Sequence, residues 1–348
     1  MEQIIGIILH SIGGFSSASF YVPSHKVKKW AWETYWITLG FVAWIIMPTI
    51  GGLLTTPDLW RIFGGSPRSG MVWSYVFGVL WGFGGLMCGL GLRYLGLALG
   101  QSISLGVCAI VGTLVPAILD KKVSMLVTTI PGAVVLLGFL VCVAGIACCG
   151  YAGVLKERLL TEEEKKESVK EFSAVKGLLL AIFGGVMSAC MALAINAGHS
   201  IAVAATQAGT AKVFSNIPIF VFALGGGFTT NFISVLILST RNKSFGNYNL
   251  RPRSTLLANY FLSLLSGLMW YGQFFFYGMG TTKMGKFDFA SWSIHMASII
   301  IFSNLWGLWL KEWTHVNHRT RAYLWLGIIT LLISVIMIGI GNNLAAAR

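Results

Sequence analysis

Ten long apolar stretches run along the 348-residue chain, and a charged linker divides them five and five. Each stretch is long enough to cross a bilayer, which takes about 20 mostly apolar residues. Because five is odd, the second group must enter the membrane from the opposite side to the first. Two inverted halves are typical of secondary transporters, in which one midplane site opens to either face. The predicted spans are 3–24, 32–54, 71–92, 96–119, 126–150, 175–197, 213–239, 255–280, 287–310 and 322–342.

Composition agrees with this plan, since 55% of the residues are hydrophobic and only 11% are charged. We therefore expect an all-α integral membrane protein of ten helices. Residues 1–150 form the first five-helix repeat, 151–174 a charged linker and 175–348 the second repeat. The first stretch has no basic start and no small-residue cleavage site, so we expect a retained helix and not a signal peptide. Within the linker, Thr161 and Glu164 form a capping box that predicts a short helix.

The basic residues are unevenly divided between the two sides of the predicted bundle. Of the 25 Lys and Arg residues, 17 fall on the side that carries the linker. The positive-inside rule then places the linker in the cytoplasm and both termini in the periplasm of a bacterial inner membrane. The net charge of +13 orients the chain and meets anionic lipid. Nucleic acid is not an expected partner.

The first and sixth stretches share a pattern of small residues at a constant offset of 171 positions. A repeated small-residue face indicates close helix packing at equivalent places in the two halves, and it favours an internal duplication. The matching residues are Gly6, Gly13, Gly14, Ser17 and Ala18 with Gly177, Gly184, Gly185, Ser188 and Ala189.

Two acidic residues lie at the start of predicted spans, among aromatic side chains. They are Glu33 in span two and Asp288 in span nine; the other ten acids lie in the linker, at the chain start, in a loop or beside lysines at helix ends. An acid within a span marks an ion or substrate path by default, so we predict that both carry or gate a proton. The alternative is an interfacial acid in an aromatic belt, paired with a nearby lysine.

Span eight carries a face that suits a sugar. Gln273 and Tyr277 are four residues apart, and Trp270 lies three residues before Gln273, so the three share one helix face. Aromatic rings pack against the C–H face of a sugar, while an amide and a phenol bond its hydroxyls. The alternative is an aromatic packing stripe in which Gln273 bonds to a neighbouring helix.

Span nine places Asp288, Trp292 and His295 on one expected stripe, where a carboxylate and an imidazole could share a proton or orient a hydroxyl. Three further polar residues lie within spans and complete the predicted substrate-binding set. They are His10, Asn196 and Gln101.

Other classes of site find little support. The six cysteines all fall inside predicted spans, where small reduced core residues are expected. His315 and His318 lack a third ligand, so we expect no metal site. No motif for nucleophilic catalysis or phosphate binding occurs, and we expect a transporter without a cofactor other than the coupling proton.

Several segments together resemble the bacterial L-rhamnose–proton symporter family. They are 20–33, 93–96, 267–277, 288–296 and 311–313. The resemblance implies the ten-helix fold of the drug/metabolite transporter superfamily and proton-driven uptake of a 6-deoxyhexose.

The sequence leaves alternatives open for substrate and for activity. Segments 100–102 and 206–209 depart from the family's pattern, which leaves L-fucose or L-lyxose as alternative sugars. A proton-antiport exporter of amphipathic metabolites would share the same fold. A membrane sensor or enzyme is a further alternative, against which the missing catalytic constellation weighs.

Overall fold

The structure, a computed structural model, describes residues 1–159 and 173–347. Within these ranges the chain is helical and contains no β-strand, which agrees with a segment buried in lipid having to satisfy its own backbone hydrogen bonds. Before the linker the helices are α1 (Glu2–Ser19), α2 (Tyr21–Ser24), α3 (Trp32–Phe41), η1 (Val42–Ile46), α4 (Met47–Thr55), α5 (Leu59–Gly65), α6 (Arg68–Leu95), α7 (Leu97–Leu119), α8 (Val123–Thr128) and α9 (Ile130–Arg158). After the linker they are α11 (Ala174–Ala197), α12 (His199–Gln207), η2 (Lys212–Phe214), α13 (Ile219–Asn242), η3 (Ser244–Asn249), α14 (Arg253–Thr281), η4 (Gly285–Ala290), α15 (Ser291–Trp309) and α16 (His318–Ala346).

Eight helical segments of the described chain are long and apolar enough to cross a membrane. They coincide with predicted spans one to seven and ten, so the prediction of an all-α integral membrane protein is confirmed. The spans predicted at 255–280 and 287–310 correspond to α14 and α15, which are helices of 29 and 19 residues. These two helices do not belong to the eight.

The second predicted span is not one regular helix. A π-helical turn, η1, separates α3 from α4 just before Pro48. Proline has no backbone N–H, and its ring crowds the carbonyl four residues earlier, here that of Trp44. Local widening to a π-turn relieves this conflict.

The helix at the fifth predicted span is longer than the span. Helix α9 continues through the predicted boundary at residue 150 and ends at Arg158. The predicted capping box of Thr161 and Glu164 lies outside the described residues.

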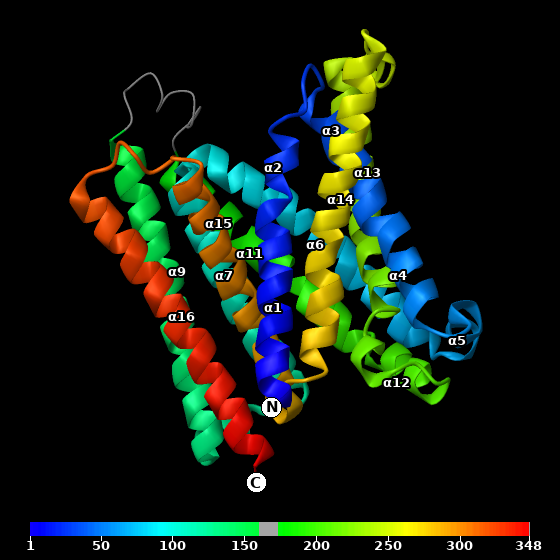
Figure 1. The fold of residues 1–348 in the computed structure, drawn as a ribbon, viewed down its shortest axis with the longest axis vertical. Coiled ribbons are helices and arrows are strands. Elements are labelled where there is room, and N and C mark those ends of the chain that lie inside the picture. The colour runs from blue at the N-terminus through cyan, green and yellow to red at the C-terminus, as the bar shows by residue number, and fades with distance from the viewer. Residues whose placement is uncertain (160–172, 348) are drawn as a thin grey trace.

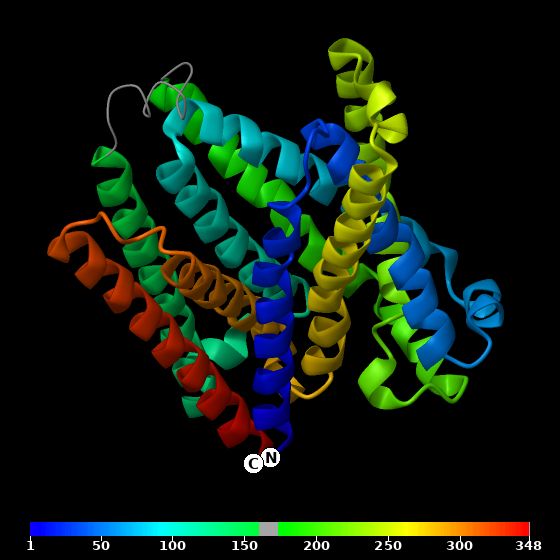
Figure 2. The same ribbon diagram turned by 45° about the horizontal axis from the view of Figure 1, so that its top comes forward.

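The helices run between two ends of the molecule. Figures 1 and 2 place both termini together at one end, which we call the terminal end. Helix α9 ends and α11 begins at the opposite end, which we call the linker end. Helices α5 and α12 lie at the terminal end (Figure 1).

Each long helix before the linker packs against helices that follow it. Helix α1 lies against α14 and α15, while α11 lies against α6 and α7. Helix α13 contacts both α6 and α3, and α9 pairs along its length with α16 at one edge of the bundle (Figure 1). The two parts of the chain are therefore interleaved and share one core.

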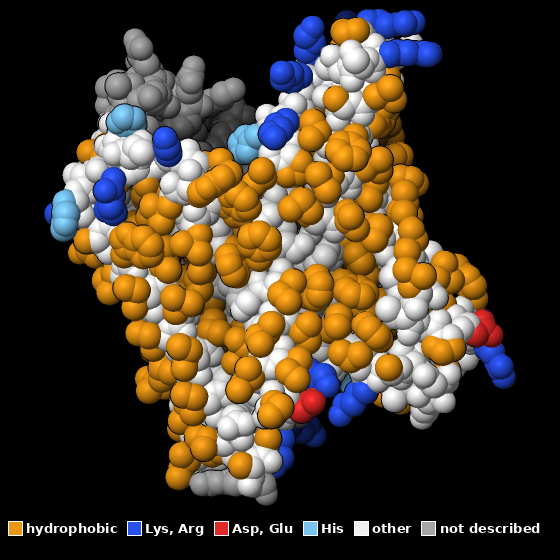
Figure 3. All heavy atoms as spheres, in the orientation of Figure 1, with side chains coloured by type: hydrophobic (Ala, Val, Ile, Leu, Met, Phe, Trp, Pro, Cys, Tyr) orange, Lys and Arg blue, Asp and Glu red, His pale blue; other side chains and the backbone are white. Residues whose placement is uncertain are grey.

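Apolar side chains cover the flank of the bundle, and Lys and Arg gather towards the linker end in this view (Figure 3). Large apolar side chains such as Leu54, Phe261 and Trp309 are exposed on the outside of the molecule. The interior by contrast contains buried polar residues, including His10, His295 and Gln273. An apolar exterior around a partly polar interior is the distribution expected for a bundle in lipid.

Candidate functional site: a polar cavity at the terminal end

A cavity of about 880 Å³ opens among the helices at the terminal end. Its walls come from the end of α7, from α11 and α12, from the end of α14, and from the turns η2 and η4. Most of the polar wall is amide, hydroxyl or ammonium. The polar side chains of the wall include Asp120, Lys122, Asn196, Thr206, Gln207, Lys212, Asn216, Tyr277, Thr281 and Asp288.

Asp288 lies at the mouth of this cavity in an ion pair. Its Oδ1 accepts a hydrogen bond of 2.6 Å from Lys122 Nζ, and its side chain is 41% exposed. The Nζ of Lys122 also lies 3.6 Å from Oδ2 of Asp120. The Oδ1 of Asp120 accepts a 3.0 Å hydrogen bond from the Asn196 amide. These charges join the α7–α8 connection to η4 and to α11 across the cavity.

The expected stripe of Asp288, Trp292 and His295 on one helix is wrong. Asp288 belongs to the 3₁₀ turn η4, and α15 begins only at Ser291. The turn starts at Gly285, which has a φ of +65°, a value that glycine adopts without strain. Asp288 therefore points to the cavity mouth, whereas Trp292 and His295 lie on α15 inside the bundle.

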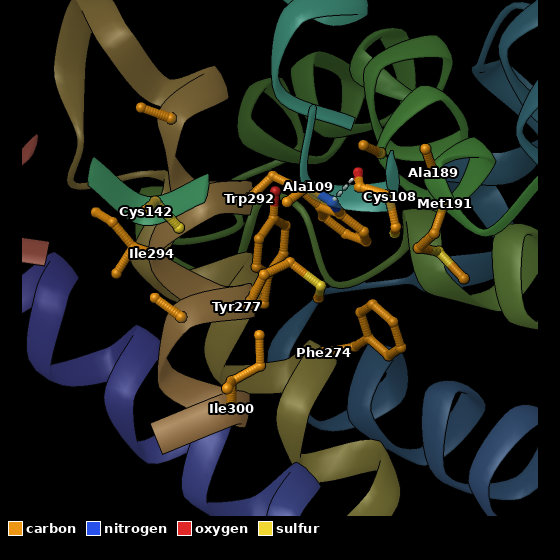
Figure 4. Close-up of a cluster of buried hydrophobic side chains, with 14 of the residues drawn as sticks. Cys108, Ala109, Cys142, Ala189, Met191, Phe274, Tyr277, Trp292, Ile294 and Ile300 are labelled. Carbon is orange, nitrogen blue, oxygen red and sulfur yellow. Dashed lines mark hydrogen bonds between the residues drawn. The ribbon is translucent and has the colours of Figure 1, made fainter. Parts of the chain in front are cut away.

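Tyr277 forms part of the cavity wall and separates the cavity from two histidines. Its ring centroid lies 5.2 Å from that of His10 and 5.1 Å from that of His295. Both histidines are fully buried. Figure 4 shows Tyr277 beside Trp292, whose Nε1 donates a 3.2 Å bond to the Cys108 carbonyl.

Trp270 and Gln273 lie along α14 on the linker side of Tyr277 and do not line the cavity. The Gln273 amide donates a 3.0 Å hydrogen bond to the Trp270 carbonyl within the same helix. The Trp270 ring packs 5.4 Å from Trp44 and 5.7 Å from Trp81. In this conformation the aromatic cluster of Trp44, Trp81 and Trp270 fills the bundle beyond Tyr277.

Glu33 is far from the cavity along the bundle, at the linker end. Its carboxylate is buried and accepts hydrogen bonds from the Asn242 amide at 3.0 Å and the Ser244 hydroxyl at 2.8 Å. Both partners lie where α13 passes into η3. Glu33 thus ties the start of α3 to the end of α13.

Gln101 lies on the first turns of α7 and is exposed. Of the nine residues that the sequence singles out, Asp288, Tyr277 and Asn196 contact the cavity. His10 and His295 lie directly behind Tyr277, while Trp270, Gln273, Glu33 and Gln101 lie elsewhere.

Lys122 and Asn216 are cavity residues that the sequence did not reveal. Lys122 follows Asp120 and Lys121 and resembles an ordinary interfacial charge. Its pairing with Asp288, 166 positions away, arises only from the fold. Asn216 donates a 3.1 Å hydrogen bond to the Gly278 carbonyl. The only local feature that could have pointed to Asn216 as a site residue is its position, as an amide shortly before Pro218.

Comparison with known proteins identifies the family. The family profile of the L-rhamnose-proton symport protein (RhaT) matches residues 1–345. The L-rhamnose-proton symporter of Yersinia pestis (strain Pestoides F) is 36% identical over 341 residues, which cover 97% of this chain and 98% of that protein. The L-rhamnose-proton symporter of Salmonella paratyphi B is 37% identical over 340 residues, 97% of each chain. The chain therefore belongs to the L-rhamnose-proton symport family, whose members are transporters and not enzymes.

Proposed function

We propose that this protein imports L-rhamnose, or a close 6-deoxyhexose, together with protons across a bacterial inner membrane. Membership of the family along almost the whole chain carries this proposal. The cavity supports it, because its volume lies within the roughly 300–1,000 Å³ of small-molecule sites. The amide and hydroxyl groups in its wall can hydrogen-bond the hydroxyls of a sugar.

The packing of the helices supports two inverted five-helix repeats, 1–150 and 175–348. In this proposal α1 corresponds to α11, α6 to α14 and α7 to α15. When each helix is replaced by its counterpart, the contact between α1 and α14 becomes the contact between α11 and α6. The same exchange converts α1–α15 into α11–α7 and leaves α9–α16 unchanged. Such an arrangement allows alternating access, in which one half rocks against the other around a fixed site.

The glycines that repeat in sequence support the same correspondence. A Cβ at Gly13 would lie 2.9 Å from the Gln273 carbonyl oxygen on α14, and one at Gly184 would lie 2.7 Å from the Cys88 nitrogen on α6. Likewise a Cβ at Gly14 would meet α15, and one at Gly185 would meet α7. Each glycine and its counterpart thus face corresponding helices, so the repeated small-residue pattern has a packing role.

The charge distribution supports an orientation with the linker in the cytoplasm and both termini in the periplasm. In that orientation the cavity opens to the periplasm, the side from which an importer loads. The aromatic cluster of Trp44, Trp81 and Trp270 then stands between the cavity and the cytoplasm.

The polar residues divide into proton and sugar roles within this scheme. Asp288 receives the proton at the open mouth, where protonation would release Lys122, and Glu33 gates its exit at the linker end. Tyr277 and Asn196 bind the sugar in the open cavity. Trp270, Gln273, His10, His295 and Gln101 complete the sugar path as the halves rock.

Uptake of labelled L-rhamnose into proteoliposomes, with and without an inward proton gradient, tests the proposal. Accumulation above equilibrium that collapses with a protonophore is the expected result. Unlabelled L-fucose and L-lyxose as competitors identify the preferred sugar. A folded preparation that shows no gradient-driven uptake of these sugars would exclude the proposal, and proton-dependent efflux would favour the exporter.

A further inference from the structure

We propose that the cavity wall built by α7 and α11 is an apolar subsite for the methyl group on C5 of the sugar. In this subsite Pro116, Ala192 and Ile195 select a 6-deoxyhexose over the hexose that carries a hydroxyl on C6. The inference rests on the proposed function and deepens it, because it states how the sugar lies in the cavity and which side chains recognise the missing hydroxyl.

Helix α7 presents one face to the cavity. Its lining residues Gly112 and Pro116, and Asp120 at its C-terminal end, are four positions apart, so they share that face. The helix begins near the end of α9, where the Glu157 carboxylate accepts a bond from the Ala98 nitrogen, and it therefore runs from the linker end to the cavity. Eight residues of helix rise about 12 Å. Gly112 thus lies deep in the cavity and Asp120 near its mouth.

Helix α11 runs in the same direction, since it begins at the linker end (Figure 1). Ala192 and Ile195 line the cavity from its deeper part, and Asn196, which bonds to Asp120, follows them. Helices α7 and α11 pack against each other, so their deep lining residues form one wall. The side chains of Pro116, Ala192 and Ile195 contain only carbon and hydrogen. This wall therefore offers a sugar no hydrogen bond from a side chain.

The wall built by α14 and η2 has the opposite character. Asn216 joins these elements by donating from its amide nitrogen to the Gly278 carbonyl, which leaves its amide oxygen to act as an acceptor. The Thr281 hydroxyl donates a 2.9 Å bond to the Tyr277 carbonyl. A hydroxyl that donates to its own helix keeps lone pairs that accept further bonds. These residues line the cavity, so the wall presents acceptors to the hydroxyl protons of a sugar.

A 6-deoxyhexose has two sides of the same kinds. Its methyl group and the neighbouring C–H bonds are apolar, whereas its ring hydroxyls donate and accept hydrogen bonds. Both sides are satisfied when the methyl group faces α7 and α11 and the hydroxyls face α14 and η2. The reverse orientation would bury hydroxyls against Pro116 and Ile195 without partners, which is unfavourable.

A hydroxyl on C6 would meet the apolar wall in the favoured orientation. Burying a methyl group is favourable, while burying a hydroxyl without a partner is not. A hydrophobic pocket discriminates against an added hydroxyl by a factor on the order of 100. We therefore expect L-rhamnose to bind about 10- to 100-fold more tightly than L-mannose, its counterpart with a hydroxyl on C6.

The test measures the binding of L-rhamnose and of L-mannose to the full-length protein in detergent by isothermal titration calorimetry. Two variants, Ala192→Ser and Ile195→Thr, each add a hydroxyl to the wall. Such a hydroxyl can accept a bond from the C6 hydroxyl even while it donates to its own helix. The readout is the dissociation constant for L-mannose divided by that for L-rhamnose, because a general loss of affinity cancels in this ratio.

The matched control is Ala197→Ser, the same substitution on the same helix at a residue outside the cavity lining. Thermal unfolding confirms that each variant is folded. The wild-type ratio should be about 10 to 100. Ala192→Ser and Ile195→Thr should each lower it about two- to tenfold, the worth of one hydrogen bond, and Ala197→Ser should leave it unchanged.

Three results would overturn the subsite. They are a wild-type ratio near one, an unchanged ratio in folded Ala192→Ser and Ile195→Thr, and an equal fall in the control. Calorimetry needs no proton gradient, so the subsite and the symport are tested separately. The expected ratios without gradient-driven uptake would support the subsite and refute the symport. A folded wild type that binds neither sugar would refute both.

Discussion

Replacing Asp288 with Asn separates the driving force of transport from the stability of the fold. The side chains of Asp288 and Lys122 are 41% and 25% exposed, and their atoms lie 2.6 Å apart. A partly exposed ion pair contributes at most about 1 kcal/mol to stability. The amide oxygen of the introduced asparagine would still be able to accept a bond from the Lys122 ammonium, so the loss should be smaller still.

The transport effect should be far larger. One proton moving inward through 100 mV releases about 2.3 kcal/mol, which supports about 50-fold accumulation of one sugar at about 1.36 kcal/mol per tenfold. If Asp288 receives that proton, the Asp288→Asn variant should bring the inside and outside sugar concentrations to equality. Exchange of labelled for unlabelled sugar, which needs no net proton movement, should continue.

The assay compares accumulation and exchange in proteoliposomes for the wild type, Asp288→Asn and a matched control, Asp58→Asn. Asp58 is the N-cap of α5, where its side chain accepts a bond from the Arg61 backbone, and Asn caps a helix equally well. The control should accumulate sugar as the wild type does. Undiminished accumulation by Asp288→Asn would refute the assignment of the proton to this carboxylate.

Two further predictions concern packing and the linker end. Gly14→Ala would place a Cβ 2.8 Å from the Ser298 carbonyl carbon on α15, so it should lower the free energy of unfolding by about 1–3 kcal/mol and lower the thermal midpoint in detergent. The control Gly225→Ala, with no atom within 4 Å of its Cβ, should leave the midpoint unchanged. An equal fall in both variants would contradict the close α1–α15 contact. Glu33→Gln keeps one acceptor but introduces a buried NH₂ group beside the Asn242 donor. Because this leaves a buried donor unpaired, the variant should lower the free energy of unfolding by about 1–3 kcal/mol. An unchanged thermal midpoint would show that the carboxylate does not hold α3 to α13.

The local sequence predicted which acids lie within spans, but not which residues they contact. Asp288 and Glu33 stand out because acids within apolar stretches are rare, and the sequence identified both. Their partners are remote: Lys122 is 166 positions from Asp288, and Asn242 is 209 positions from Glu33. The alternative in which each acid pairs with a nearby lysine is therefore wrong, because sequence neighbours do not determine which helices meet.

Hydropathy by itself determined that this chain forms apolar membrane helices, and eight of the ten predicted spans are among the membrane-length segments. The reason is physical, since a backbone in lipid must bond to itself and a helix of about 20 residues does so. Motif similarity determined the family. Only the tertiary structure decided that Tyr277 faces a cavity while Gln273, one turn earlier, does not, and that His10 meets His295 from the far end of the chain. Helix rotation and helix pairing depend on contacts between distant side chains, and no local period in the sequence encodes them.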